Sequence, residues 1–583
     1  KNTSDHTNAN GGNYIYLAIG DDEIGSDEDC LVDVPNAVTA DADATDTTGG
    51  YQRGNYATLN PLDTKLVHSN GNLDATASTS QTWVTGRGTI AMTSGKFYWE
   101  ITINSLSTTS DTAVQLGIGA LTAALPSNDG AADSNAYVYL NSNGQKMSGG
   151  SAASYGASYT TGDVIGVAFD ADNGTLAFYK NGISQGTAYS SFDTDKQYAP
   201  LVSLGRSSTS TSISANFGQR PFAISSIPTG FKSLCTTNLT DPTIADGSTA
   251  FGALTYSGNG SARTLTGLNM NPDFIWIKSR SSAQKHVLVD SVRTTSTGEY
   301  LASDSTQAEG TGVHISGTTD GITIADPNAS TIWYNDSSHT YVAWAWDGGT
   351  STVSNTDGSI TSSVRANASA GFSIVSASPS SGSTVGHGLN AEPGLIIAKR
   401  TGATSHWPVY HSYLGANKFL YLNLTNGSGT GSDFWNNVSP TSSVFTVGSD
   451  SGVTGGTTIF YCFSAVESYS AMGAYTGNGA GGYPNADGPF VYVGFRPRFV
   501  LIKASSQAEN WVIYDTARST YNVLDDQLYP NASTAETSGA NREIDVYSNG
   551  FKIRSNSGQV NSNGATYAYA AFAEHPFKTA RAR

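Results

Sequence analysis

The chain has 583 residues, of which 38% are hydrophobic and 13% are charged, and its formal net charge at pH 7 is −17. A chain this acidic is unsuited to tracking phosphate groups, so nucleic acid is excluded as a partner, and no apolar run is long enough to span a membrane. The 64 glycines, with abundant Thr and Tyr, favour β-sheets joined by tight turns over helical bundles.

The first predicted element is a strand in "NYIYLAIGDD" (13–22), which mixes aromatic, small and apolar residues and ends in acid. Three later segments have the same composition: "TYVAWAWDGG" (340–349), "TTIFYCFSAVES" (457–468) and "TYAYAAFAEHPFK" (566–578). We expect residues 13–20 to be the last strand of an upstream unit whose body precedes this sequence. The acidic run at 21–33 is expected to be a solvated linker.

Residues 50–225 follow a different pattern. In "GKFYWEITI" (95–103) large apolar residues alternate with Tyr98, Glu100 and Thr102, which predicts a half-buried antiparallel strand. The segment "GDVIGVAFDADNGTLAFYKNG" (162–182) contains two Asn-Gly pairs, and such pairs favour hairpin turns. Further strands are predicted in "YAPLVSL" (198–204) and "SISANFGQRPF" (212–222).

These segments, in this order, resemble the SPRY domain: "GKFYWEI", "GDVIGVAFD…GTLAFYKNG", "YAPLVSL" and "ANFGQRPF". The resemblance covers about residues 50–225. It implies a two-sheet antiparallel sandwich of the jelly-roll kind. It also implies a binding module without chemistry of its own, which binds through loops at one edge of the sandwich.

The remainder contains a pattern that occurs three times. Each copy has Pro, one residue, four mostly large apolar residues and Lys, and the copies are "PDFIWIK" (272–278), "PGLIIAK" (393–399) and "PRFVLIK" (497–503). Twelve residues after each Lys stand Asp290, His411 and Asp515. Each copy closes on an aromatic residue 68, 64 or 69 positions after its Lys, namely Trp346, Phe463 and Phe572. Matched order at nearly fixed spacing predicts duplicated units of domain length.

The predicted fold class is therefore all-β, with a SPRY-like jelly-roll sandwich followed by three duplicated sandwich-like domains in tandem. The expected divisions are 1–35 for the strand and linker, 36–228 for the sandwich, and 229–352, 353–468 and 469–583 for the three units. Within a unit, the continuous apolar strands "FIWI" and "FVLI" are expected to be central and buried on both faces.

The flanking segments "PDFIWIK…VLVDSVR", "WPVYHSYLGANKFLYLN" and "YAAFAEHPFKTARAR" resemble C-terminal repeats beside SPRY domains in tailed-phage structural proteins. This resemblance implies an extracellular virion appendage, a tail fibre or adhesin, that binds other virion subunits and a host-surface glycan or receptor. Two alternatives stay open: a structural decoration protein and a polysaccharide depolymerase. Exposed strand edges and small units predict a homo-oligomer, and the tail-fibre resemblance favours a trimer.

No enzyme motif, cofactor site or metal-ligand spacing is found, so a non-enzymatic protein without a cofactor is expected. Cys30, Cys235 and Cys462 are far apart and are expected to be small buried apolar residues. Asp290 and Asp515 begin Asp-x-x-Arg motifs, which favour structural ion pairs over catalysis. The candidate ligand-binding residues are aromatic side chains in polar loops: Trp435 in "GSDFWNNVSP" and Tyr483 in "GAGGYPNADGPF".

Overall fold

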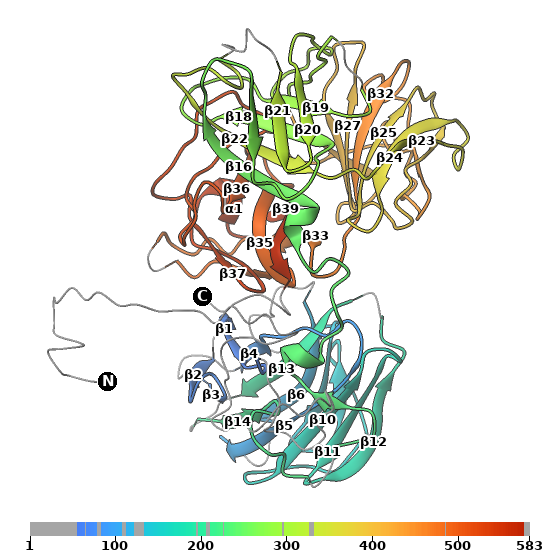
Figure 1. Ribbon diagram of the computed structural model, residues 1–583. Coiled ribbons are helices and arrows are strands. Elements are labelled where there is room, and N and C mark those ends of the chain that lie inside the picture. Colours follow the sequence, from blue (N-terminus) through green and yellow to red (C-terminus); the bar gives the residue numbers. More distant parts are fainter. Residues whose placement is uncertain are drawn as a thin grey trace, which may run out of the picture.

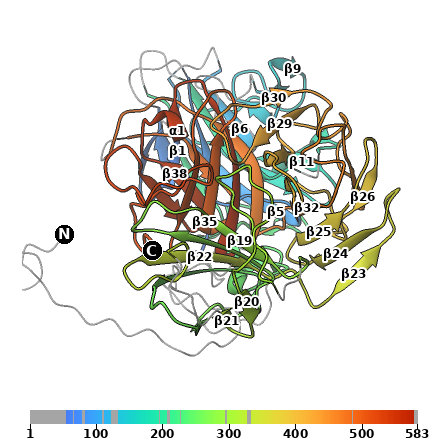
Figure 2. The same cartoon turned by 90° about the horizontal axis from the view of Figure 1, so that it is seen from above.

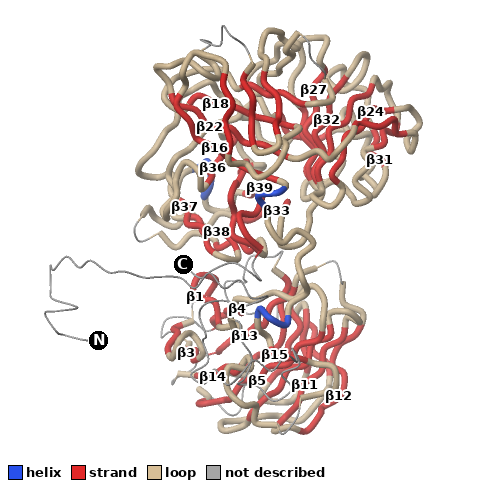
Figure 3. Tube along the Cα trace, in the orientation of Figure 1, coloured by secondary structure: helices blue, strands red, loops and turns tan. Residues whose placement is uncertain are grey.

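The computed structural model describes residues 55–576, apart from 65, 78–82, 108–111, 122–132, 194–195, 206–209, 225–226, 294–296, 326–331 and 484–485. It has two parts, an N-terminal sandwich (55–238) and a larger C-terminal part (250–576), joined by one connecting segment (Figure 1). Strands dominate both parts, as Figure 3 shows. The strand predicted at 13–20, the acidic run and Cys30 lie outside the described residues.

The described part of the chain has little helix. It contains the short α1 (Gly558–Asn561) and the 3-10 turns η2 (Thr236–Asn238) and η3 (Gly247–Thr249). Among the described residues no helix has the length and apolar character needed to cross a membrane. The predicted all-β fold is confirmed.

The N-terminal sandwich consists of two antiparallel sheets. The first has the order β1 (Leu59–Thr64), β4 (Trp83–Gly88), β13 (Tyr198–Gly205), β6 (Val114–Ala120), β7 (Ala136–Leu140), β8 (Lys146–Ser148) and β9 (Ser151–Ala153). The second has the order β12 (Ile183–Ser190), β11 (Thr175–Lys180), β10 (Val164–Asp170), β5 (Lys96–Ser105), β14 (Ser212–Asn216), β3 (Asp74–Thr76) and β2 (Val67–Ser69), and β15 (Lys232–Ser233) adds to β5 in parallel. Their inner faces form one apolar core.

Strand β5 departs from the sequence prediction on its outer face. Its inner residues Phe97 and Trp99 lie in the core between the sheets, as expected. Tyr98 and Glu100, expected to be on an open face, are buried as well. The segment after β14 covers them: Phe222 packs edge-on against Tyr98, with ring centroids 5.2 Å apart, and the Ala223 N–H donates to Glu100 at 2.8 Å. The half-buried prediction is therefore wrong for these two residues.

The two predicted Asn-Gly hairpins differ in their turns. Asn181 and Gly182 have φ values of 49° and 80°, and they alone join β11 to β12, as a type I′ turn requires. The β10–β11 hairpin has a longer loop, in which Gly174 has a φ of 60°. Its start is held by Asp170, which accepts from the Asn173 backbone at 3.0 Å and pairs with Lys96.

The C-terminal part contains three bodies, each with a larger and a smaller sheet. Body 1 (250–347) has the orders β16 (Phe251–Ser257), β22 (Thr340–Trp346), β18 (Phe274–Ser279), β19 (Val287–Asp290) and β17 (Arg263–Thr266), β21 (Gly321–Ile324), β20 (Ile315–Thr318). Body 3 (469–576) has the orders β33 (Ser470–Thr476), β39 (Thr566–Pro576), β35 (Phe495–Ala504), β36 (Trp511–Asp515) and β34 (Phe490–Tyr492), β38 (Gly550–Ile553), β37 (Ile544–Tyr547).

Body 2 (352–464) has the same central order with added edge strands. Its larger sheet runs β23 (Thr352–Asn355), β24 (Ser362–Asn367), β25 (Phe372–Ala377), β32 (Thr458–Phe463), β27 (Leu395–Arg400), β28 (Pro408–His411), β29 (Lys418–Tyr421) and β30 (Gly429–Thr430). Its smaller sheet pairs β26 (Thr384–Gly386) with β31 (Val444–Thr446). In every body the closing strand, β22, β32 or β39, is central.

The closing strands are buried on both faces because two different cores meet them. In β22, Ala343 and Ala345 face the smaller sheet of body 1, whereas Trp344 and Trp346 face the other bodies. Trp346, Phe463 and Phe572, one from each closing strand, pack together with ring centroids 5.5–6.0 Å apart. The three bodies therefore surround one aromatic centre. Figure 2 shows the backbones of the three bodies side by side, seen from above.

The lysine contacts between bodies run in one cyclic direction. Lys278 of body 1 donates to the Ser533 carbonyl of body 3 at 3.1 Å. Lys399 of body 2 donates to Thr306 of body 1 at 3.0 Å, and Lys503 of body 3 donates to Thr425 of body 2 at 2.9 Å. Because each body contacts both others, the C-terminal part is closed, and we call it the ring.

Candidate functional site

The matched positions Asp290, His411 and Asp515 all lie at contacts between bodies. The Tyr461 hydroxyl donates to Asp290 at 2.8 Å, and the Trp344 indole N–H donates to Asp515 at 2.9 Å. His411 instead donates from Nε2 to the Tyr569 carbonyl at 3.0 Å. These residues join neighbouring bodies, so their place in the fold is structural.

The difference at His411 follows from the closing strand that it faces. Asp290 and Asp515 face side chains that carry a donor, an O–H or an N–H. The residue of β39 two before Phe572 is Ala570, which has no donor. A carboxylate there would be buried without a partner, whereas neutral imidazole can donate to the backbone and accept the Tyr413 N–H at Nδ1.

Both Asp-x-x-Arg motifs form the predicted ion pairs. Arg293 bonds Asp290 at 2.6 Å, and Arg518 bonds Asp515 at the same distance. In each motif the other carboxylate oxygen accepts from the backbone N–H of the Arg. A second carboxylate, Glu309 or Glu536, completes each guanidinium. The carboxylates and guanidinium groups of both motifs are therefore paired with each other.

Burial changes the titration of the groups that join the bodies. Desolvation lowers the pKa of Lys278, Lys399 and Lys503 to about 8, because their ammonium groups are taken out of water. Desolvation likewise lowers the pKa of His411 to about 4, with the bond to Tyr569 opposing it. Such shifts also mark catalytic groups, but here each shifted group has a structural partner.

Within the described residues, no three His, Cys, Asp or Glu side chains are grouped so that they could hold a metal ion. The thiols of Cys235 and Cys462 are buried, as expected. Burial raises the pKa of the Cys462 thiol, which makes it a poor nucleophile.

The two predicted ligand-binding aromatics have different positions. Trp435 is 1% exposed and packs against Tyr410, with ring centroids 5.8 Å apart, so its prediction as an exposed stacking residue is wrong. Tyr483 is 51% exposed and stays a candidate. The structure does not bring these residues together, because Trp435 lies in the core of body 2 and Tyr483 lies in body 3.

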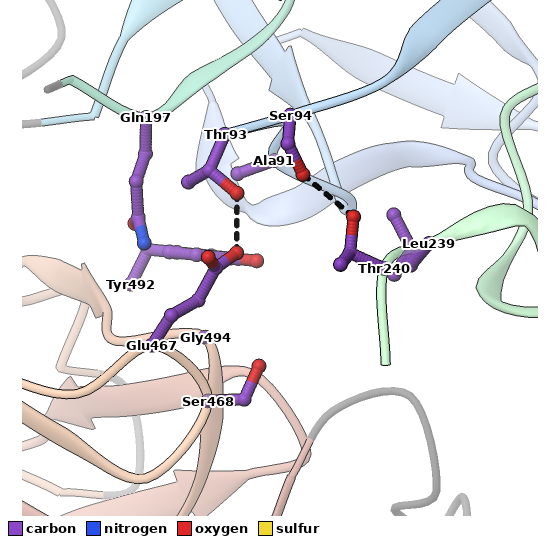
Figure 4. Close-up of a pocket in the computed structure, with 10 residues that line it drawn as sticks. All are labelled: Ala91, Thr93, Ser94, Gln197, Leu239, Thr240, Glu467, Ser468, Tyr492 and Gly494. Carbon is purple, nitrogen blue, oxygen red and sulfur yellow. Dashed lines mark hydrogen bonds between the residues drawn. The ribbon is translucent and has the colours of Figure 1, made fainter. Parts of the chain in front are cut away.

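A pocket lies where the N-terminal sandwich meets body 3 (Figure 4). Residues from three parts of the molecule line it. These are Ala91, Thr93, Ser94 and Gln197 of the sandwich, Leu239 and Thr240 of the connection, and Glu467, Ser468, Tyr492 and Gly494 near or in body 3. Thr93 donates to Glu467, and Ser94 bonds Thr240 at 2.6 Å, as the dashed lines in Figure 4 show. We call this contact the joint.

Two more hydrogen bonds cross the joint. The Lys552 ammonium donates to the Leu62 carbonyl at 2.7 Å, and the Asn549 amide donates to the Thr89 carbonyl at 3.0 Å. None of these residues stands out in the sequence, because the two residues of each contact are between 146 and 490 positions apart. No local signal could have identified them.

The opposite end of the sandwich lies away from the joint. Strands β4, β5 and β13 have one end beside Thr89, Ser94 or Gln197 and the other end at Trp83, Ser105 or Gly205. We call that second end the far end. Described residues near these strand ends bond one another: the Ser107 N–H donates to the Thr211 hydroxyl at 3.0 Å, and the Ala77 N–H donates to the Thr211 carbonyl.

Trp83 is a half-buried aromatic residue at the far end. A Cβ at Gly205 would lie only 3.1 Å from the indole, so glycine lets the ring lie across the neighbouring strand. The partial exposure of Trp83 at the far end makes it a candidate anchor for a ligand.

Comparison with known proteins finds a family match for the ring. A family model described as "Domain of unknown function (DUF7483)" matches residues 246–576, which is more than half of the chain and includes all three bodies. The chain belongs to the DUF7483 family. The divisions between the bodies that we predict from sequence are not resolved by that model and stay predictions.

The N-terminal sandwich matches the SPRY domain model at residues 96–220, which confirms that resemblance. Similar curated proteins include a Ran-binding proteins 9/10 homolog of Drosophila melanogaster, 38% identical over 96 residues, and Ran-binding protein 9 of Homo sapiens, 37% identical over 91 residues. These matches cover 16% and 15% of this chain. The chain spans only 10% and 12% of the length of those relatives.

Similar solved structures include the SPRY domain of human HERC1, with a TM-score of 0.25 and 20% identity, covering 27% of this chain and 96% of that one. Another is stonustoxin, with a TM-score of 0.22 and 20% identity, covering 27% of each chain.

These relatives contradict the functional expectations drawn from the phage resemblance. They are Ran-binding proteins of animals, so the tail-fibre or adhesin function and the virion location are wrong. The expected partners, virion subunits and a host-surface glycan, are wrong for the same reason. The homo-trimer was expected to cover the faces of the small units, but the three bodies of one chain cover those faces themselves.

Proposed function

We propose that this protein is a non-enzymatic binding protein in which the far end of the SPRY sandwich binds a polypeptide partner. One observation carries the proposal: the sandwich that resembles Ran-binding proteins is held by its joint end, so its other end is left to bind. Trp83, the first residue of β4, lies half-buried at that end. Binding residues are commonly placed on loops that a rigid scaffold positions.

The chemistry of the relatives supports a protein ligand. The similar curated proteins are named for binding a partner, Ran. A half-buried Trp on a rigid strand provides a large contact area with little loss of conformational entropy, as hot spots of protein interfaces do.

We further propose that the ring is a scaffold built from three duplicated units. In each body the closing strand lies between equivalent strands of the larger sheet. Lys278, Lys399 and Lys503 pair with equivalent positions of these strands, namely Val342, Ile459 and Ala568. The shifted titratable groups are used three times for contacts between bodies. A catalytic group is expected once in a chain and not at three equivalent contacts, which supports a non-enzymatic protein.

A display library of random peptides, selected on the full chain, tests the binding proposal. We expect enriched peptides whose affinity falls about tenfold or more in Trp83→Ala, a factor that corresponds to about 1.4 kcal/mol. Tyr413→Ala is the matched control, because Tyr413 is 54% exposed on body 2, far from the sandwich in sequence. Failure to enrich any peptide, or equal losses in both variants, would contradict the proposal.

A further inference from the structure

Each body of the ring has a smaller sheet, but only the smaller sheet of body 3 meets the SPRY sandwich in the described structure. In body 3, Phe490 pairs with Lys552, and Tyr492 pairs with Gly550. We call Phe490, Tyr492, Asn549 and Lys552 the docking face. Asn549 and Lys552 supply two of the hydrogen bonds that cross the joint.

Strand register identifies the corresponding residues of body 1. There Thr264 pairs with Thr323, and Thr266 pairs with Gly321. The two glycines confirm the alignment, because a Cβ at Gly321 or Gly550 would lie 1.9 or 2.2 Å from the carbonyl oxygen of the paired strand. Body 1 therefore has threonine at the positions of Phe490, Tyr492 and Lys552.

Body 2 shows the same contrast. Thr384 pairs with Thr446, and Gly386 pairs with Val444, so neither an aromatic residue nor a lysine stands there. Another segment of body 2 contacts this smaller sheet. The Ser359 N–H donates to the Thr384 hydroxyl at 2.7 Å, and Ile360 forms a β-bridge with Val385. In body 1, Thr264 and Thr266 are exposed.

The substitutions in body 3 match what the SPRY sandwich offers. The Lys552 side chain is 4% exposed, and besides Leu62 its ammonium contacts Asp487 at 2.7 Å. Tyr492 lines the pocket at the joint together with Ala91, a residue of the sandwich. A buried ammonium without acceptors is costly, so Lys552 favours the arrangement in which Leu62 is present.

We propose that Tyr492, Asn549 and Lys552, beside Phe490 on the same sheet, form an intramolecular docking site that selects the SPRY sandwich of the same chain and fixes its orientation on body 3. The other two faces lack these residues and do not compete for the sandwich. This inference does not depend on a polypeptide ligand: the docking face would hold the sandwich whatever binds at the far end.

The test replaces the docking face with its counterpart from body 1. In the full chain, Phe490→Thr, Tyr492→Thr and Lys552→Thr are combined, which body 1 shows to be compatible with this sheet. Spin labels at Val67→Cys on the sandwich and Tyr521→Cys on body 3, both exposed positions, report their separation, with Cys30 changed to Ser. We expect a narrow distance distribution in the otherwise unchanged chain and a broad one in the triple variant.

The matched control changes the same positions of body 1, Thr264→Val, Thr266→Val and Thr323→Val, and we expect the narrow distribution to persist. Circular dichroism shows whether the ring has stayed folded. If it has not, the single variant Lys552→Thr provides the same comparison. A narrow distribution in the docking-face variants, or a broad one before any substitution of that face, would overturn the proposal. Peptide binding at the far end is scored separately, so the two proposals can fail independently.

Discussion

At the scale of single residues, Trp435 lies in a polar segment although its side chain belongs to the core of body 2. Asn436 and Asn437, which follow it, have φ values of 52° and 56°. Two consecutive residues in this region turn the chain sharply, which Asn tolerates better than most residues. The turn directs the indole inward, against Tyr410. The polar residues next to Trp435 therefore indicate a turn and do not indicate that the tryptophan is exposed.

Substitutions at Trp435 should follow packing and should not depend on hydrogen bonding, because its buried indole N–H has no partner in the described structure. Trp435→Ala should lower the unfolding free energy by about 3–5 kcal/mol through the cavity that it leaves, and Trp435→Phe by about 1–2 kcal/mol. Urea denaturation followed by circular dichroism measures both. Equal and small losses would show that the side chain is not in a core.

Lys503 should make folding more favourable as the pH rises. Its pKa is about 8 in the folded chain and ordinarily 10.5, so between these values the unfolded chain binds a proton that the folded chain lacks. This stability is complete above pH 10.5 and is lost as the pH falls to 8, with a slope of up to about 1.4 kcal/mol per pH unit. Urea midpoints from pH 8 to 10 should rise more steeply in the unchanged chain than in Lys503→Met. Lys418→Met, which removes a partly exposed lysine, is the control, and parallel slopes for all three proteins would refute the assignment.

At the scale of elements, the apolar strands could be predicted in place from the sequence. β18, β27 and β35 contain the runs after the three prolines, and β22, β32 and β39 contain the aromatic closing runs. Those patterns are local, so composition and spacing are enough. The outer face of β5 could not be predicted, because the segment that covers Tyr98 and Glu100 arrives more than a hundred residues later.

The buried ion pairs of the ring should contribute more to the free energy of unfolding than exposed pairs do. Asp515→Ala removes the partner of buried Arg518 and of the Trp344 indole, and we expect a loss of about 3 kcal/mol or more. Asp193→Ala breaks the exposed pair with Lys196 and should cost less than about 1 kcal/mol. Denaturation of the two variants in parallel checks the difference, which should vanish if the Asp515 contacts contribute nothing to the ring.

At the scale of the whole molecule, sequence patterns indicated three similar segments but did not show how they meet. The candidate site was missed for the same reason, since Trp83 and the docking face are defined by neighbours from other segments. The closing aromatic residues could equally serve three separate cores. Their meeting at one centre depends on Trp346, Phe463 and Phe572 facing each other across bodies, which no local pattern encodes.

Hydrogen exchange in Phe572→Ala, followed by mass spectrometry on the full chain, tests the closed ring most directly. Removing this ring from the aromatic centre should weaken protection in β22 of body 1 and β32 of body 2 as well as in β39, because one core stabilises all three strands. Protection in β10 of the SPRY sandwich should stay unchanged, because its core is separate. Faster exchange confined to body 3 would contradict the closed ring.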